Sequence, residues 1–154
     1  MKIYIASDHR GFELKNKIKE WLLAWNLNFE DFGATNYNDS DDYPDFISLA
    51  SIAVAKDPEN SRAIILGASG QGEAVLANKY KGVRAVVYYG GPRDIIKLSK
   101  EHNNANVLSL GASFLSEGDA KEIVKLWLDT NFSGDERHIR RIEKIKQLEN
   151  ENFK

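Results

Sequence analysis

Short runs of apolar residues alternate along this chain with longer stretches in which apolar residues recur every three or four positions. The first pattern is typical of buried strands and the second of amphipathic helices. The short runs predict strands at 3–6, 28–32, 63–66, 83–88 and 106–110. The longer stretches predict helices over 14–25, 44–54, from a glycine-rich turn through 78, 92–100 and 120–128, and a charged last helix over 135–150.

This strand-helix alternation, repeated five times, predicts the fold class. It favours an α/β protein in which a five-stranded parallel sheet lies between two layers of helices. Ligands of such sheets bind beyond the carboxyl ends of the strands. The candidate ligand-binding loops are therefore those that follow strands, at 7–11, 67–72, 89–92 and around Gly111.

The composition limits the possible partners and the chemistry. A length of 154 residues suits one domain, and we expect a single domain over 1–154. The net charge of −2 gives no general attraction to nucleic acid or to an anionic membrane. The absence of cysteine excludes disulfides and thiolate nucleophiles. The apolar run at the start is too short to span a membrane, so we expect a soluble, cytoplasmic protein.

A glycine-rich segment, GASGQGE at 67–73, follows the most apolar strand. Its spacing fits neither the dinucleotide fingerprint nor the P-loop, and Gln71 breaks the nucleophile elbow of hydrolases. Three glycines let the backbone approach a ligand, and the start of the next helix should favour an ionised Glu73. The alternative is a plain tight turn that leaves Glu73 exposed.

Three further segments carry polar groups that could act on a ligand. Asp8 and His9 end the first strand, where they could exchange protons or bind an anion, although Asp8 could simply cap the next helix. His102 lies in a polar loop, where a histidine is often merely solvated. Arg137 and Arg141 are four residues apart and share a helix face, as a phosphate clamp requires, unless they belong to a solvated charged face. All three histidines of the chain fall in these segments.

Taken together, these motifs resemble the ribose-5-phosphate isomerase B family, which includes the galactose-6-phosphate isomerase subunits. The match runs along nearly the whole chain and rests on the segments 7–15, 42–46, 67–79, 82–85, 102–107 and 137–141. The resemblance implies a Rossmann-like α/β/α fold and a homodimer or tetramer whose active sites are shared between subunits. It also implies that the C-terminal helix at 135–154 packs on a partner subunit, through the stripe Ile139, Ile142, Ile145 and Leu148.

The resemblance also implies roles for particular residues. One branch of the family abstracts a proton with a cysteine, whose position here is Leu66 or its neighbour, and the other branch uses a glutamate that matches Glu73. This chain resembles the glutamate branch, with Ser69 at the anion hole and His102 opening the sugar ring near Asp8. The implied contacts to substrate and phosphate are His9, Arg137, Arg141, Gly70, Gly72 and Asn103. Many members carry a phosphate-binding arginine where this chain has Ser113.

The implied function is aldose-ketose isomerisation of a sugar phosphate, with ribose 5-phosphate converted to ribulose 5-phosphate through a cis-enediolate. No step of this chemistry demands a metal or an organic cofactor. One alternative is a non-catalytic module that binds a sugar phosphate for regulation, which leaves Glu73 unexplained because a carboxylate disfavours anion binding. Another is a flavodoxin-like or nucleotide-binding domain, for which the pair Tyr88 and Tyr89 is the only stacking candidate.

Overall fold

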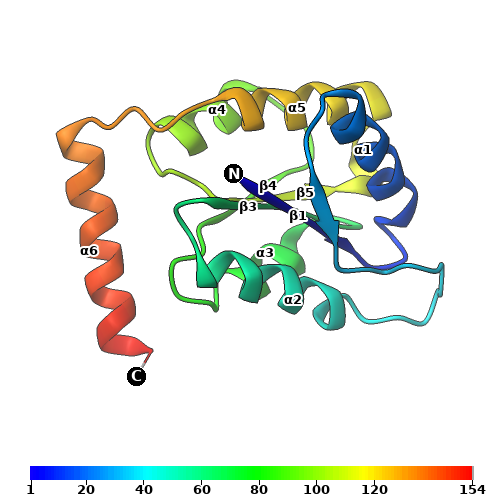
Figure 1. Ribbon diagram of the computed structural model, residues 1–154, viewed down its shortest axis with the longest axis horizontal. Helices are drawn as coiled ribbons and strands as arrows, with labels where there is room; N and C mark the ends of the chain where they lie inside the picture. The colour runs from blue at the N-terminus through cyan, green and yellow to red at the C-terminus, as the bar shows by residue number, and fades with distance from the viewer. Residues whose placement is uncertain (154) are drawn as a thin grey trace.

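A five-stranded parallel sheet forms the centre of the molecule in a computed structural model that describes residues 1–153 (Figure 1). Lys154, the last residue of the predicted C-terminal extension, lies outside the described residues. The strands are β1 (Lys2–Ser7), β2 (Phe29–Asp31), β3 (Ser61–Gly67), β4 (Ala85–Tyr88) and β5 (Val107–Gly111). Their order across the sheet is β2-β1-β3-β5-β4, and every neighbouring pair is parallel.

Helices cover both faces of this sheet, which confirms the predicted three-layer fold. Figure 1 shows α1, α4 and α5 on one face and α2 and α3 on the other. The helices are α1 (Phe12–Ala24), α2 (Tyr43–Lys56), α3 (Gln71–Ala77), α4 (Asp94–Glu101), α5 (Glu117–Asp129) and α6 (Glu136–Asn152), with a short 3₁₀ turn, η1 (Ala112–Phe114), that the pattern did not predict.

The central strand β3 shows why the sheet needs both helix layers. Ile64 and Leu66 belong to the core under α1 and α5, whereas Ala63 and Ile65 belong to the core under α2 and α3. All four side chains are fully buried. A strand in a parallel sheet that is covered on both faces reads as a continuous apolar run. The register pairs Gly67 with Gly111, which aligns the carboxyl ends of β3 and β5.

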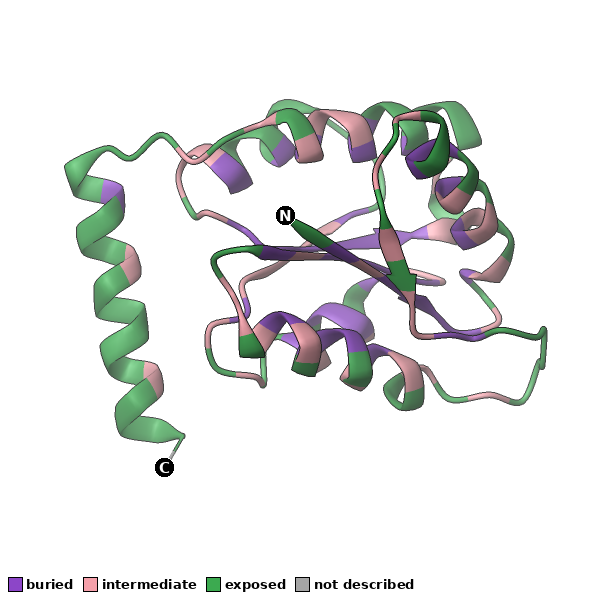
Figure 2. Cartoon of the chain, in the orientation of Figure 1, coloured by how far each residue is buried: buried purple, intermediate pink, exposed green. Residues whose placement is uncertain are grey.

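Helix α6 stands apart from this body. It lies beyond the amino ends of the strands (Figure 1), and most of its surface is exposed (Figure 2). His138 in its first turn is its one buried residue, whereas Ile139, Ile145 and Leu148 are 46%, 46% and 56% exposed. The apolar stripe of α6 is therefore left largely uncovered by its own chain. None of the helices within residues 1–153 is both long enough and apolar enough to cross a membrane.

Candidate active site

The glycine-rich segment forms a tight connection between β3 and α3. Gly70 has a φ of 75°, in the left-handed region that favours glycine. A Cβ at this position would also lie only 3.0 Å from the carbonyl carbon of Leu110. The Ser109 hydroxyl donates a 2.6 Å hydrogen bond to the Gly70 carbonyl and joins the loop to β5. The loop is therefore held against the carboxyl end of the neighbouring strand.

Glu73 turns inward from the first turn of α3 and is only 4% exposed. The alternative of a plain turn with an exposed glutamate is therefore wrong. Burial raises the pKa of Glu73, a hydrogen bond from its own backbone N–H opposes that rise, and the nearby charge of Asp8 adds to it. We expected the start of the helix to favour the ionised form, but burial outweighs it. A raised pKa brings the carboxyl closer to neutral pH, where a general base works best.

Two residues of the loop have further defined contacts. The Ser69 hydroxyl oxygen accepts a 3.3 Å hydrogen bond from the Gln71 N–H, so its own proton remains available for another acceptor. A Cβ on Gly72 would lie 2.9 Å from the hydroxyl oxygen of Tyr43. Tyr43, at the start of α2, therefore lies directly against the loop, although no separate role was predicted for it.

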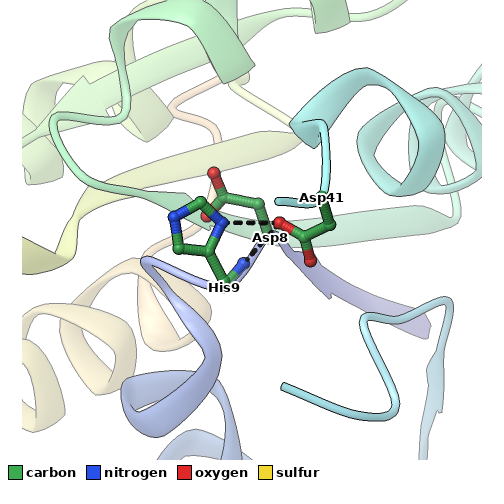
Figure 3. Close-up of side chains that lie close together, drawn as sticks. All are labelled: Asp8, His9 and Asp41. Carbon is green, nitrogen blue, oxygen red and sulfur yellow. Dashed lines mark hydrogen bonds and ion pairs between the residues drawn. The ribbon is translucent and has the colours of Figure 1, made fainter. Parts of the chain in front are cut away.

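Asp8 and His9 follow β1 (Figure 3), so they lie at the carboxyl ends of the strands, as the glycine-rich loop does. One oxygen of Asp8 accepts hydrogen bonds from the N–H groups of Arg10 (2.9 Å) and Gly11 (3.3 Å), so this carboxylate does close the turn before α1. His9 Nδ1 lies 2.6 Å from Asp41 Oδ1. Asp41 comes from the loop between β2 and α2 and was not among the predicted site residues.

Asp8, His9 and Asp41 each offer a ligand atom, and these atoms lie within 4.8 Å of one another. Carboxylate and imidazole are donor types that could hold a divalent cation. The spacing of the sequence did not predict this group, because Asp41 is 32 residues from His9. In the structure the His9 and Asp41 atoms instead bond to each other.

The other predicted site residues lie near the amino ends of the strands, whereas Glu73 lies near the carboxyl ends. His102 and Asn103 precede β5, so they lie beside its amino end, about the length of a strand from Glu73, or roughly 20 Å. The His102 ring stacks on the His138 ring of α6, with centroids 4.2 Å apart and planes 15° from parallel. Arg137 and Arg141 flank His138 on α6, and both are exposed.

One chain thus gathers the predicted residues into two groups. The group at the carboxyl ends of the strands contains Asp8, His9, Ser69, Gly70, Gly72 and Glu73. The group at the amino ends contains His102, Asn103, Arg137 and Arg141. The expected proximity of His102 to Asp8 does not occur within one chain. Among the described residues, neither Arg137 nor Arg141 forms an ion pair with a carboxylate.

Three remaining expectations concern single positions. Leu66 is buried in the core, so its neighbour Gly67 is the position that contacts Glu73. Ser113 lies in η1 and donates its backbone N–H to the Ala68 carbonyl at 3.0 Å, so the position of the family arginine adjoins the glycine loop. Tyr88 is buried, with its hydroxyl bonded to the Gly91 carbonyl at 2.9 Å, and cannot stack on a nucleotide.

Comparisons with known proteins agree with this geometry. Residues 3–145 match the ribose/galactose isomerase family. The chain is 36% identical over 149 residues to ribose-5-phosphate isomerase B of Mycobacterium tuberculosis, covering 97% of this chain and 90% of that protein. The crystal structure of ribose-5-phosphate isomerase B from Mycoplasma genitalium with bound ribulose-5-phosphate superposes with a TM-score of 0.93 at 38% identity, covering 98% and 97% of the two chains.

A second solved structure gives the same result. Ribose-5-phosphate isomerase B from Clostridium thermocellum superposes with a TM-score of 0.89 at 40% identity and covers 98% of this chain and 99% of its own. The superposition therefore spans both the segment of the glycine loop and the C-terminal helix. The chain belongs to the ribose/galactose isomerase family.

Proposed function

We propose that this protein is an aldose-ketose isomerase that interconverts ribose 5-phosphate and ribulose 5-phosphate. The observation that carries the proposal is the buried carboxylate of Glu73, which lies by the carboxyl ends of the parallel strands. Its burial raises its pKa. Such a group can take a proton from carbon and return it to a neighbouring carbon. A carboxylate in that place has no use in merely binding a phosphate, so a regulatory binding module is the weaker explanation.

The chemistry balances without an oxidant or a reductant. Glu73 removes the proton from C2 of the open-chain aldose, the electron pair of that C–H bond forms the C1–C2 double bond, and the electrons of the C1 carbonyl move to O1, which leaves a cis-enediolate with its negative charge on that oxygen. The proton of the O2 hydroxyl then passes to O1, the C2 carbonyl forms from the electron pair left on O2, and Glu73 returns its proton to C1. The Ser69 hydroxyl, whose proton is not used within the loop, donates to the enediolate oxygen.

The proposed site is completed by a second copy of the chain. In this proposal His102 opens the ring, and Arg137 and Arg141 bind the phosphate. These residues lie near the amino ends of the strands, away from Glu73. A two-fold dimer can bring the amino ends of the strands in one copy to the carboxyl ends of the strands in the other. Such a dimer forms two equivalent sites. The uncovered apolar stripe of α6 then gains a surface to pack on. His9 contributes to the phosphate site from the Glu73 side.

The direct test of the proposed function is to incubate the protein with ribose 5-phosphate and follow ribulose 5-phosphate by NMR. Allose 6-phosphate and galactose 6-phosphate are run in parallel to measure substrate preference. We expect ribulose 5-phosphate to form until equilibrium is reached. Binding of all three sugar phosphates without conversion of any of them would instead identify a non-catalytic module.

The shared site is tested by complementation between two inactive chains, Glu73→Ala and Arg137→Ala. In a mixed dimer both defects fall in one site and the other site is intact. Random pairing makes half of the dimers mixed, so activity should recover to roughly a quarter of the wild-type value. If both residues served a site within one chain, every site would keep a defect and the mixture, verified by mass spectrometry, would stay inactive.

A further inference from the structure

The ring of His9 is held by a residue from a distant part of the chain. Asp41 Oδ1 accepts the backbone N–H of His9 at 3.0 Å and lies 2.6 Å from His9 Nδ1 (Figure 3). The Asp41 side chain is only 7% exposed, and that of His9 is 19% exposed. Two hydrogen bonds to one carboxylate oxygen fix both the backbone and the ring of His9.

This contact also decides which ring nitrogen is free. An ionised carboxylate only accepts hydrogen bonds, so His9 Nδ1 must carry the proton that it shares with Asp41. The second nitrogen, Nε2, points away from Asp41 and has no partner within residues 1–153 (Figure 3). A carboxylate that holds one imidazole nitrogen sets the orientation and tautomer of the ring and directs the other nitrogen to its target.

The loop that carries Asp41 is itself anchored. The fully buried Lys15 places its ammonium 2.7 Å from Asp31 Oδ1 and 2.7 Å from the Ala34 carbonyl oxygen. The Ala34 N–H donates to the Ser7 carbonyl at 2.6 Å, which ties the start of the loop to the end of β1. The start of the loop that carries Asp41 is therefore held at the end of β1, next to His9.

An aromatic side chain from the same loop limits the ring from another direction. The Tyr37 ring meets the His9 ring edge to face, with centroids 6.2 Å apart and planes 89° apart. Tyr37 also packs edge to face on Phe12 at the start of α1, at 6.0 Å. The loop between β2 and α2 therefore restricts the His9 ring by one hydrogen-bonded contact and one aromatic contact.

We propose that Asp41 is a positioning residue, which holds His9 with Nε2 directed at the phosphate of the substrate. This inference rests on the proposed function, in which His9 binds that phosphate. The two hydrogen bonds set the ring before substrate arrives, so that binding does not have to order it. Asp41 itself does not touch the substrate, and its effect on the reaction passes through His9.

The inference is tested with Asp41→Leu, Asp41→Asn and the control Asp39→Asn. Asp39 lies on the same loop, and within residues 1–153 its carboxylate accepts a hydrogen bond only from the hydroxyl of the adjacent Ser40. Leucine removes both hydrogen bonds, whereas the amide oxygen of asparagine can still accept them. Because a hydrogen bond to a charged group is involved, Asp41→Leu should raise KM for ribose 5-phosphate by roughly tenfold or more, with a smaller change in kcat.

A second readout does not depend on turnover. Nitrogen NMR of the His9 ring reports which nitrogen carries the proton, and inorganic phosphate serves as the probe ligand. Wild type should show a proton on Nδ1 and a phosphate-dependent shift at Nε2. Asp41→Leu should lose both, Asp41→Asn should keep most of both, and Asp39→Asn should match wild type. A merely structural role would lower thermal stability without moving the tautomer.

Two results would overturn the inference. One is an Asp41→Leu variant whose KM stays within about twofold of wild type, and the other is a His9 ring whose tautomer and phosphate response are the same in Asp41→Leu and wild type. Failure of the proposed function looks different. In that case the wild-type protein shows no isomerase activity while the His9 ring still responds to phosphate and still depends on Asp41.

Discussion

The carboxylate of Glu73 fills the space in which a side chain on Gly67 would stand. A Cβ on Gly67 would overlap the carboxylate carbon and both of its oxygens. Gly67 does not have a positive φ, so its backbone conformation alone does not require glycine. The presence of Glu73 does, and a buried glutamate here excludes any side chain at residue 67.

Gly67→Ala should therefore displace the carboxylate of Glu73 and lower kcat by about a hundredfold, the usual cost of misplacing a reacting group by about 1 Å. The change is measured as turnover of ribose 5-phosphate, with circular dichroism to verify folding. Gly118→Ala is the matched control, because a Cβ on Gly118 in α5 meets no atom of the described residues within 4 Å. Wild-type turnover in a folded Gly67→Ala protein would show that the position of Glu73 is not critical.

The raised pKa of Glu73 predicts a dependence of stability on pH. The folded protein favours the protonated form of this group, whereas the unfolded chain ionises it near the ordinary value of 4.5. The stability that this group contributes is therefore present below that value and is lost as the pH rises through the folded pKa. Glu73→Gln removes the cost of ionising the buried carboxylate.

We accordingly expect Glu73→Gln to unfold at a higher temperature than wild type at pH 8, with the difference shrinking toward pH 4. Thermal unfolding followed by circular dichroism across this range measures it. Glu20→Gln is the control, because Glu20 is exposed on α1 and should change stability equally little at both pH values. A Glu73→Gln protein that is less stable than wild type at pH 8 would contradict a net cost of burial.

His102→Asn should harm ring-closed substrates more than open ones. His102 is assigned to ring opening, for which the imidazole has a suitable intrinsic pKa, and not to proton transfer between carbons. Ribose 5-phosphate exists mostly as a ring, whereas erythrose 4-phosphate cannot cyclise because its ring-forming hydroxyl carries the phosphate. The ratio of kcat/KM for the two substrates should change by about tenfold or more in favour of the open one. Equal losses on both substrates would place His102 elsewhere in the reaction.

Isomerase activity should survive removal of divalent metals and treatment with thiol-alkylating reagents. In the proposed reaction the proton transfer needs only Glu73 and hydrogen-bond donors, and the chain has no cysteine. Activity is measured after exhaustive dialysis against EDTA, and again after Zn²⁺ or Mn²⁺ is added back. Activity that disappears on chelation and returns with metal would instead give Asp8, His9 and Asp41 a role as cation ligands.

The sequence predicted the fold and the place of the glycine-rich loop, because both depend on local patterns. Apolar periodicity located all five strands, and the glycines after β3 located the loop that presents Glu73. The burial of Glu73 could not be predicted in this way. It depends on the packing of α3 against Gly67 at the end of β3, and a sequence pattern does not show which side of a seven-residue helix turns inward.

Contacts between distant loops were also beyond the sequence. The bond between His9 and Asp41 joins residues 32 positions apart, and no spacing rule relates them. The stack of His102 on His138 forms because α6 lies along the amino ends of the strands, whereas the resemblance implied that this helix packs on a partner subunit. The contact of His9 with Asp41 follows from the pairing of β1 with β2, which the alternation of helices and strands did not specify.

Glu73→Gln tests the central claim most directly, because glutamine keeps the size of the side chain and removes its ability to take a proton. The measurement is steady-state turnover of ribose 5-phosphate, with KM determined alongside kcat. We predict that kcat falls by at least about two decades while KM changes little, since general-base catalysis is typically worth that much. A Glu73→Gln protein that turns over ribose 5-phosphate at nearly the wild-type rate would show that Glu73 is not the base.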